Sequence, residues 1–267
     1  MRRISIDQRL RMVAFRRLLR IQYKGMKKLI IPSIKRIYRD YAISRSSILN
    51  NIPEELKSGV GKRFCFSKEY RFLYFRIPKS ANSTITNSLA GAIFTSMEID
   101  DKGINAKSKF DNISSLYKLN EEEILSRFFC FTFVRNPYSR VLSAFLDKID
   151  KENSSMAKRA GIPDRTGFPG FLEYLANGGL NRNPHWAPQT NLIPIAPEKL
   201  NFVGRVENLE QDFGKISRKI FGSSKPLFVR NSGRKFSESR FSDFYNSKEK
   251  DLVKKLYSDD FKRFYSE

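Results

Sequence analysis

Apolar residues along the chain form two kinds of pattern, short continuous runs and stripes at helical spacing. Residues 71–77 and 128–134 are runs of the length and composition of buried strands. Each run breaks into a polar turn, and apolar residues at helical spacing follow over about 84–97 and 137–149. A further strand and helix are predicted over 200–221. This alternation predicts an α/β fold, a mostly parallel sheet flanked by helices.

The N-terminal part of the chain carries one apolar stripe surrounded by basic side chains. Apolar residues recur at spacings of three and four between Met12 and Tyr41. We expect Pro32 to divide this stripe into helices near 6–30 and 33–42. A basic amphipathic helix either lies on an anionic membrane or docks its stripe on the rest of the protein. The pattern alone does not distinguish these two outcomes.

The domain division follows from this contrast. Residues 1–48 are predicted to be a basic amphipathic helical extension, 49–63 a linker that contains Pro and Gly, and 64–267 the α/β domain. The extension has 14 Lys and Arg against two acidic residues, which is more than half of the chain's net charge of +22. Such a charge predicts attraction to polyanions: acidic glycan, anionic lipid or nucleic acid.

Polar side chains gather where each of the first two predicted strands ends. The first strand runs into Ile77-Pro-Lys-Ser-Ala-Asn-Ser-Thr84, and the second runs into Val134-Arg-Asn-Pro137. A helix follows each turn, and its N-terminus presents free N–H groups and the positive end of the helix dipole. Each turn also supplies a cation. The two turns together predict a ligand with two separate phosphate groups. Neither turn has the residue spacing of a Walker A loop.

These two segments resemble the cofactor-binding segments of sulfotransferases, in particular the Golgi-type carbohydrate sulfotransferases of the chondroitin and HNK-1 branch and their bacterial relatives. The resemblance covers about residues 64–265. It implies a sulfotransferase-like fold related to the P-loop NTPases, and 3′-phosphoadenosine 5′-phosphosulfate as the sulfate donor. The residues that it assigns to the 5′-phosphosulfate are Lys79, Ser80, Ala81, Asn82, Ser83 and Thr84. Arg135 and Ser143 are assigned to the 3′-phosphate.

Sulfuryl transfer to an alcohol needs a base near the acceptor hydroxyl and a cation near the leaving oxygen. Lys79 is the predicted cation. His185 is the only histidine of the chain, in a stretch similar to a His-Trp-x-Pro-Gln segment of the family, and it is the predicted base. The neighbouring Trp186 is expected either to stack on a sugar face or to brace this loop by packing. Glu207 is the alternative base, unless it fixes an arginine of the second segment.

Several features bear on the partners. Arg230 and Arg234, in a late basic loop, are expected either to meet an acidic glycan or the donor, or to belong to a solvated loop without a ligand. A glycan acceptor is expected, acidic or lipid-linked, with the N-terminal extension on an anionic membrane surface and no specific nucleic acid.

The two cysteines, Cys65 and Cys130, lie in apolar runs and are predicted to be free thiols. No metal site is expected, because no Cys/His cluster has ligand spacing.

The sequence has no run of about 18 uncharged apolar residues, so we expect a cytoplasmic protein at the inner face of the membrane. Eukaryotic members of the family, by contrast, resemble Golgi enzymes with a membrane anchor.

Two other classes of protein remain as alternatives to a carbohydrate sulfotransferase. A non-catalytic polyanion- or membrane-binding protein on the same fold fits the charge but does not explain the two phosphate segments. A nucleotide-dependent kinase requires a Walker A loop or acidic magnesium ligands near Lys79.

Overall fold

The computed structural model describes residues 27–94, 104–110, 112–151, 154–163, 165–228 and 241–265. The chain forms two compact units, Met1–Tyr41 and Ala42–Glu267. Helix α2 (Lys27–Arg45) continues across Pro32, so the predicted break there is wrong. A proline removes one intrahelical hydrogen bond, and a long helix can continue past that loss. The predicted helix over 6–30 lies largely outside the described residues.

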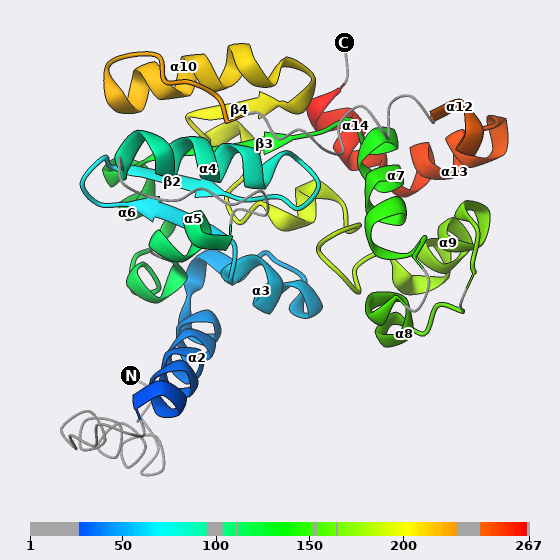
Figure 1. Ribbon diagram of the computed structural model, residues 1–267, viewed down its shortest axis with the longest axis horizontal. Helices are drawn as coiled ribbons and strands as arrows, with labels where there is room; N and C mark the ends of the chain where they lie inside the picture. Colours follow the sequence, from blue (N-terminus) through cyan, green and yellow to red (C-terminus); the bar gives the residue numbers. More distant parts are fainter. Residues whose placement is uncertain are drawn as a thin grey trace. The chain divides into compact units, whose positions relative to one another are not determined.

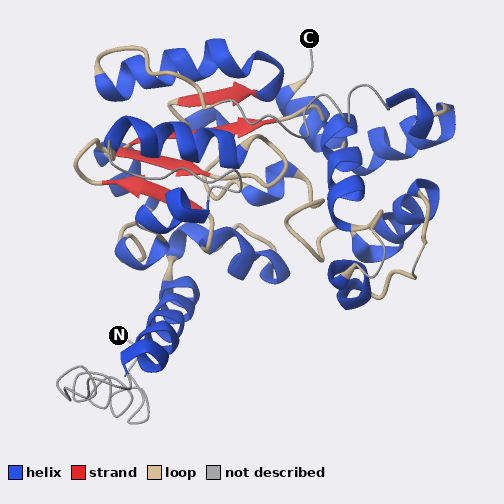
Figure 2. Cartoon of the chain, viewed as in Figure 1, coloured by secondary structure: helices blue, strands red, loops and turns tan. Residues whose placement is uncertain are grey.

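The second unit is built on a four-stranded sheet with the order β1-β2-β3-β4 (Figures 1 and 2). Strands β2, β3 and β4 are parallel, and β1 pairs antiparallel with the free edge of β2. The α/β fold with a mostly parallel sheet flanked by helices is therefore confirmed. The strands are β1 (Phe64–Ser67), β2 (Phe72–Phe75), β3 (Phe129–Val134) and β4 (Phe202–Arg205).

Alternate residues of the strands enter separate apolar cores on the two faces of the sheet. Phe72 and Tyr74 of β2 belong to one core, and Leu73 and Phe75 to the other. A continuous apolar run in the sequence is thus buried on both sides. The first face is covered by α4 (Asn82–Ile93), α5 (Ile104–Lys109) and α10 (Leu209–Phe221). The second is covered by α3 (Glu54–Gly61), α6 (Glu121–Arg127) and α14 (Ser258–Phe264).

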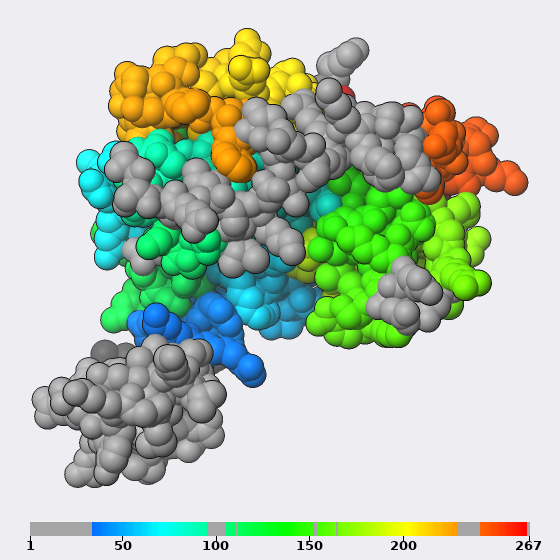
Figure 3. All heavy atoms as spheres, in the orientation of Figure 1, coloured from blue at the N-terminus to red at the C-terminus, as the bar shows by residue number. Residues whose placement is uncertain are grey.

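A third apolar core lies within a group of helices beside the sheet. Phe145 and Phe171 meet there around the fully buried Trp186. In Figure 3 these helices form the green and orange surface at the right. They are α7 (Pro137–Lys148), α8 (Ser155–Ala160), α9 (Phe168–Tyr174), α12 (Phe241–Phe244) and α13 (Ser247–Leu256).

The linker predicted over 49–63 is not observed. This segment contains α3, and it buries an apolar stripe in the second core of the sheet, formed by Leu49, Ile52, Leu56 and Val60. Its glycines serve close packing, since a Cβ on Gly61 would lie 2.6 Å from Cγ1 of Ile43. The second unit accordingly begins at Ala42, before the boundary that the sequence predicted.

The remaining helical turns of the described residues are short. They are η1 (Ser47–Leu49), η2 (Ile113–Ser115), η3 (Leu175–Gly179), η4 (Gln189–Leu192), η5 (Pro197–Lys199) and η6 (Val206–Asn208). Within the part of the chain that the structure describes, no helix combines the length and the apolar character needed to cross a bilayer.

Candidate active site

The turn after β2 holds two residues in the left-handed region. The angle φ is +68° at Lys79 and +53° at Ala81, and neither residue is glycine. Each costs about 1–2 kcal/mol, which surrounding contacts must offset. The turn leads directly into the 12-residue helix α4 at Asn82, whose first N–H groups have no partner within the helix. The strained turn therefore presents backbone N–H groups at the carboxyl edge of the sheet, where anions bind.

The turn after β3 places Arg135 beside the first turn. β2 and β3 are parallel neighbours, so the two turns lie at the same edge of the sheet. Arg135 is buried, and one of its guanidinium nitrogens lies 3.5 Å from the carbonyl oxygen of Lys79. Asn136 caps α7 by accepting a hydrogen bond from the N–H of Tyr138 at 3.0 Å. Ser143 lies half-buried, about two turns into the same helix.

Lys79 forms an ion pair with Asp147, which lies one turn beyond Ser143 on α7. Lys79 Nζ is 3.1 Å from Asp147 Oδ2, and the ammonium groups of Lys148 and Lys151 lie 3.0 Å and 3.2 Å from the same carboxylate. Burial lowers the pKa of Lys79 to about 8, although Asp147 raises it. Burial raises the pKa of Asp147, but Lys79 and Lys148 outweigh this and hold it below its usual value. Lys79 is therefore a cation that loses its proton just above neutral pH.

Gln189 joins the two turns through its side-chain amide. Its Oε1 accepts from the Ser80 hydroxyl at 3.0 Å and from the Arg135 N–H at 2.9 Å, and its Nε2 donates to the Arg135 carbonyl at 2.9 Å. Asp260 of α14 accepts from the Gln189 N–H at 2.8 Å and from Nε2 at 3.3 Å. Gln189, Asp260 and Ser80 are fully buried. The Ser80 hydroxyl thus lies inside the protein, which corrects the expectation that it lines the phosphate cradle.

Arg140 is a second, fully buried clamp. It donates from Nε to the carbonyl of Pro78 at 3.1 Å, and from its terminal nitrogens to the carbonyls of Ala187 at 2.7 Å and Pro184 at 3.0 Å. Burial lowers the pKa of this guanidinium, and Asp260 raises it. Arg140 therefore ties the start of the first turn to the segment that contains His185.

His185 is held by Asn183. The Asn183 Oδ1 atom lies 3.0 Å from the His185 backbone nitrogen and 2.8 Å from ring atom Nδ1. Because an amide oxygen only accepts, this pattern assigns the hydrogen to Nδ1 and leaves a lone pair on Nε2. Burial, together with the positive charges of Arg63, Lys148 and Lys79, lowers the pKa of His185 to about 3. The imidazole is neutral at neutral pH and its Nε2 can accept a proton.

Trp186 does not fit its predicted role in stacking on a sugar. The side chain is fully buried, its Nε1 donates to the carbonyl of Gly179 at 2.9 Å, and its ring packs edge-on against Phe171 and Tyr174. It offers no face to a ligand, so the prediction is wrong. Trp186 instead anchors the segment that positions His185.

Glu207 holds the start of α7. Its Oε1 accepts from the N–H of Asn136 at 2.8 Å, and its Oε2 accepts from the hydroxyl of Tyr265 at 3.0 Å. These contacts give Glu207 a structural role at the backbone of the second turn.

The other predicted residues divide into two groups. Residues 82–84 form the first turn of α4, where the Ser83 hydroxyl accepts from Nζ of Lys107 at 3.0 Å. Arg230 and Arg234 lie outside the described residues. Within the described residues, no group of three or more His, Cys, Asp or Glu side chains could hold a metal ion.

Comparisons with known proteins agree with this geometry. Residues 62–266 match the family described as the sulfotransferase family. The chain is 33% identical to carbohydrate sulfotransferase 14 of Homo sapiens, over 56% of this chain and 44% of that protein. It is 25% identical to carbohydrate sulfotransferase 8 of Mus musculus, over 67% of this chain and 48% of that protein. The chain spans about half the length of the curated relatives it matches. No solved structure matches it.

These relatives correct the expected location. They are eukaryotic carbohydrate sulfotransferases, the branch that the resemblance associates with the Golgi, so the prediction of a cytoplasmic protein is wrong. That prediction rested on the absence of an apolar run from the printed sequence, and such an absence does not determine a compartment.

Proposed function

This chain belongs to the sulfotransferase family, and we propose that it transfers a sulfuryl group from 3′-phosphoadenosine 5′-phosphosulfate to a hydroxyl group of a carbohydrate. The carbohydrate sulfotransferases among its relatives support the acceptor class. One observation carries the proposal: Lys79 and Arg135 follow adjacent parallel strands, and Gln189 fixes the spacing of the two turns.

The residues of the two turns fit an anionic donor with two separate charged groups. Each turn combines a cation with the N-terminus of a 12-residue helix, Lys79 with α4 and Arg135 with α7. We assign the phosphosulfate to Lys79 and the backbone N–H groups of residues 82–84, and the 3′-phosphate to Arg135 and Ser143. When bound, the donor supplies an activated sulfuryl group, which leaves the phosphate oxygen as the acceptor oxygen attacks from the opposite side.

The chain's own groups then have distinct tasks. The protonated Lys79 ammonium stabilises the negative charge that develops on the leaving phosphate oxygen. Nε2 of His185 accepts the proton that the acceptor hydroxyl loses. Burial is the main cause of the low pKa of His185 in the protein without bound anions, and the charges of Lys148 and Lys79 add to it. Anions bound at these lysines offset their charges and raise the pKa of His185 toward the range of an effective base.

Binding of adenosine 3′,5′-bisphosphate tests the donor assignment. We expect calorimetry to show that this ligand binds much more tightly than adenosine 5′-phosphate, and that Arg135→Gln removes about 2–4 kcal/mol of that preference. Gln189 contacts only the backbone of Arg135, so the substitution leaves that network in place. Arg127→Gln, on exposed α6 surface, is the matched control.

Transfer of radiolabelled sulfate from the donor to a set of glycans tests the activity itself. The proposal fails if wild-type protein binds neither the donor nor its bisphosphate product. The assignment of Arg135 alone fails if the variant discriminates between the two nucleotides as well as wild type does.

A further inference from the structure

Lys148, the last residue of α7, is a cation at the site to which the proposed function assigns no step. Its Nζ lies 3.0 Å from Oδ2 of Asp147, and Nζ of Lys79 lies 3.1 Å from the same oxygen. The two ammonium groups therefore converge on one point, close enough to share a single anionic oxygen. Carboxylate and sulfuryl oxygens both accept hydrogen bonds and both carry negative charge. A sulfuryl oxygen in the place of Oδ2 would therefore contact both lysines.

The fold holds Lys148 at this point and shields it from solvent. The Lys148 side chain is 28% exposed, whereas that of Lys151, which contacts the other oxygen of Asp147 at 3.2 Å, is 56% exposed. The Ser154 hydroxyl donates to the Lys148 carbonyl, and the next residue, Ile149, is buried in the core of the helices beside the sheet. The backbone at the end of α7 is thus fixed, which reduces the entropy lost when Lys148 binds a ligand.

Lys148 is also near the candidate base. Its charge lowers the pKa of His185, and it does so more strongly than the charge of Lys79. Lys148 likewise contributes to lowering the pKa of Lys79, after burial. Lys148 is therefore close to both groups of the proposed transfer, the cation assigned to the leaving oxygen and the base assigned to the acceptor hydroxyl.

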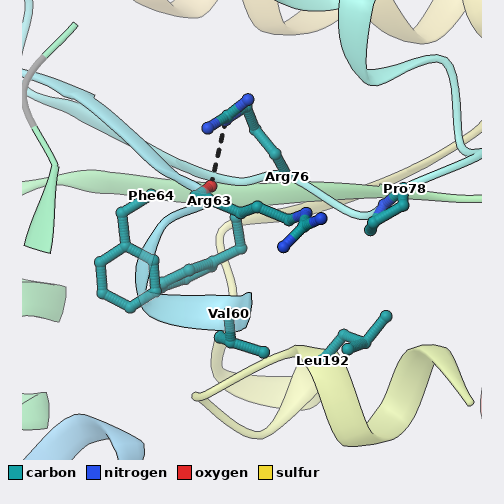
Figure 4. Close-up of a pocket in the computed structure, with 7 residues that line it drawn as sticks. Val60, Arg63, Phe64, Arg76, Pro78 and Leu192 are labelled. Atoms are coloured by element: carbon teal, nitrogen blue, oxygen red, sulfur yellow. Dashed lines mark hydrogen bonds between the residues drawn. The ribbon is translucent and has the colours of Figure 1, made fainter. Parts of the chain in front are cut away.

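The arginines near His185 are bonded to backbone carbonyls. Arg63 and Arg140 both contribute to lowering the pKa of His185. Arg63 donates to a carbonyl of α3, and Arg76 donates to the carbonyl of Arg63 at 3.2 Å, the bond drawn in Figure 4. Arg140 makes the three carbonyl bonds described above. The two lysines instead contact a carboxylate, whose place an incoming anion can take.

We propose that Lys148 binds the oxygens of the sulfuryl group while this group passes from the donor to the acceptor, and that it is a third catalytic residue beside Lys79 and His185. In this step the bond between sulfur and the phosphate oxygen breaks, and its electron pair stays on that oxygen, beside Lys79. A lone pair of the acceptor oxygen forms the new bond to sulfur, and the proton of the acceptor hydroxyl passes to Nε2 of His185. Lys148 keeps its protons and orients the sulfuryl group for attack from the side opposite the leaving oxygen. This inference rests on the proposed function and adds a residue to it.

Calorimetry with two ligands isolates this contact. Binding of 3′-phosphoadenosine 5′-phosphosulfate in the absence of acceptor is compared with binding of adenosine 3′,5′-bisphosphate, for wild type, Lys148→Met and Lys148→Arg. At pH 7 the two ligands carry nearly the same total charge, because the single charge of the sulfate replaces the second charge of the 5′-phosphate. Loss of a lysine that acts only by long-range attraction therefore weakens both ligands alike. Loss of a direct contact to the sulfuryl group weakens the sulfated ligand more.

We expect Lys148→Met to weaken binding of the sulfated ligand by about tenfold more than binding of the bisphosphate, and Lys148→Arg to keep part of the difference. The rate of a single turnover at saturating donor should fall by roughly 10–100-fold in Lys148→Met, because the sulfuryl group is no longer held in line. Lys151→Met is the matched control, since it removes a more exposed lysine from the same carboxylate. It should change the ratio of the two affinities by less than about threefold.

A second comparison separates contact with the sulfuryl group from an indirect effect through Asp147. If Lys148 only neutralises that carboxylate, Lys148→Met has no selective effect in an Asp147→Asn background. A direct contact predicts that the selective loss for the sulfated ligand persists there. The inference is overturned if Lys148→Met weakens both ligands equally, or if its selective effect disappears in the Asp147→Asn background. Should Lys148→Met fail to fold, Lys148→Gln takes its place with the same expected results.

Failure of the proposed function gives a different result. In that case wild-type protein binds neither of the two ligands, and no sulfate is transferred to any glycan. A protein that binds both ligands and transfers sulfate, but whose ratio of affinities is unchanged by Lys148→Met, is a sulfotransferase in which Lys148 does not contact the sulfuryl group.

Discussion

Asp147→Asn removes the charge that Lys79 pairs with and preserves the shape of the side chain. The Lys79 side chain is 17% exposed, the Asp147 side chain is 38% exposed, and the paired atoms are 3.1 Å apart. Two unit charges at that distance interact by roughly 5 kcal/mol at an effective dielectric constant of 20. Solvent and the two other lysines screen this to about 1–2 kcal/mol. Since one pKa unit is about 1.4 kcal/mol, the pKa of Lys79 should fall from about 8 to about 7.

The pH dependence of kcat/KM for the donor measures this shift in the pKa of Lys79, because kcat/KM depends on the pKa values of groups in the free enzyme. Lys79 acts as a cation, so activity should be lost as the pH rises through its pKa. We expect the alkaline limb to lie near pH 8 in wild type and about one unit lower in Asp147→Asn. Near pH 6 Lys79 is protonated in both proteins. There, adenosine 3′,5′-bisphosphate should bind the variant more tightly, because a negative charge beside its 5′-phosphate has been removed.

Two variants separate this effect from a general change of charge. Asp150→Asn removes an exposed carboxylate just beyond the end of α7 and should leave the alkaline limb in place. Combining Asp147→Asn with Lys79→Arg should also restore activity at high pH, because a guanidinium keeps its proton. An alkaline limb that does not move in Asp147→Asn would show that Lys79 is not the group that titrates.

Three further outcomes follow from the structure. His185→Gln should lower turnover by roughly 10²–10⁴-fold in a sulfate-transfer assay with bisphosphate affinity near wild type, since an amide cannot take the proton; turnover within a fewfold of wild type would remove His185 as the base. Gln189→Ala should lower the free energy of unfolding by about 3–5 kcal/mol in urea titrations, because the buried Ser80 hydroxyl and the Arg135 backbone lose their partner. The control Gln211→Ala, at an exposed position, should change it by less than about 0.5 kcal/mol. We propose that the basic N-terminal unit binds anionic membrane surfaces, because α2 exposes Ile37, Tyr38 and Tyr41 among basic residues. Deleting residues 1–41 should then reduce co-sedimentation with phosphatidylserine vesicles, while binding of adenosine 3′,5′-bisphosphate persists.

The sheet and its two polar turns were predictable because they are local features of the sequence. A buried parallel strand needs a continuous apolar run, and such runs end directly before the turns of Lys79 and Arg135. Asn136 and Pro137 likewise predict the start of α7 without knowledge of any other segment. The predicted linker failed for a different reason. The segment was predicted to be a linker from its proline and glycines, although its apolar residues already recur at helical spacing in the sequence.

The contacts that hold the site together were not predictable in this way. Gln189 is 54 residues from Arg135 and 71 from Asp260, and a single amide or carboxylate carries no periodic signal. The burial of Trp186 also depends on a distant helix, α9, which covers its ring. Long-range polar contacts are determined by the folded geometry, so sequence patterns locate the ligand-binding turns but not the residues that fix them.

The positions of the donor-binding cation and the candidate base are set by the same network. Arg140 connects Pro78, beside Lys79, to the segment around His185, while Gln189 connects both turns to α14. Because these side chains are buried and bond to backbone atoms or to other buried side chains, the two functional groups are held in one rigid frame before any ligand binds, as preorganised catalysis requires. A change at Arg140 or Gln189 should therefore alter donor affinity and turnover together. A change at Asp147 should act through charge alone, on the ionisation of Lys79 and on the affinity for the anionic donor, and comparing the two kinds of variant distinguishes positioning of the site from tuning of its charge.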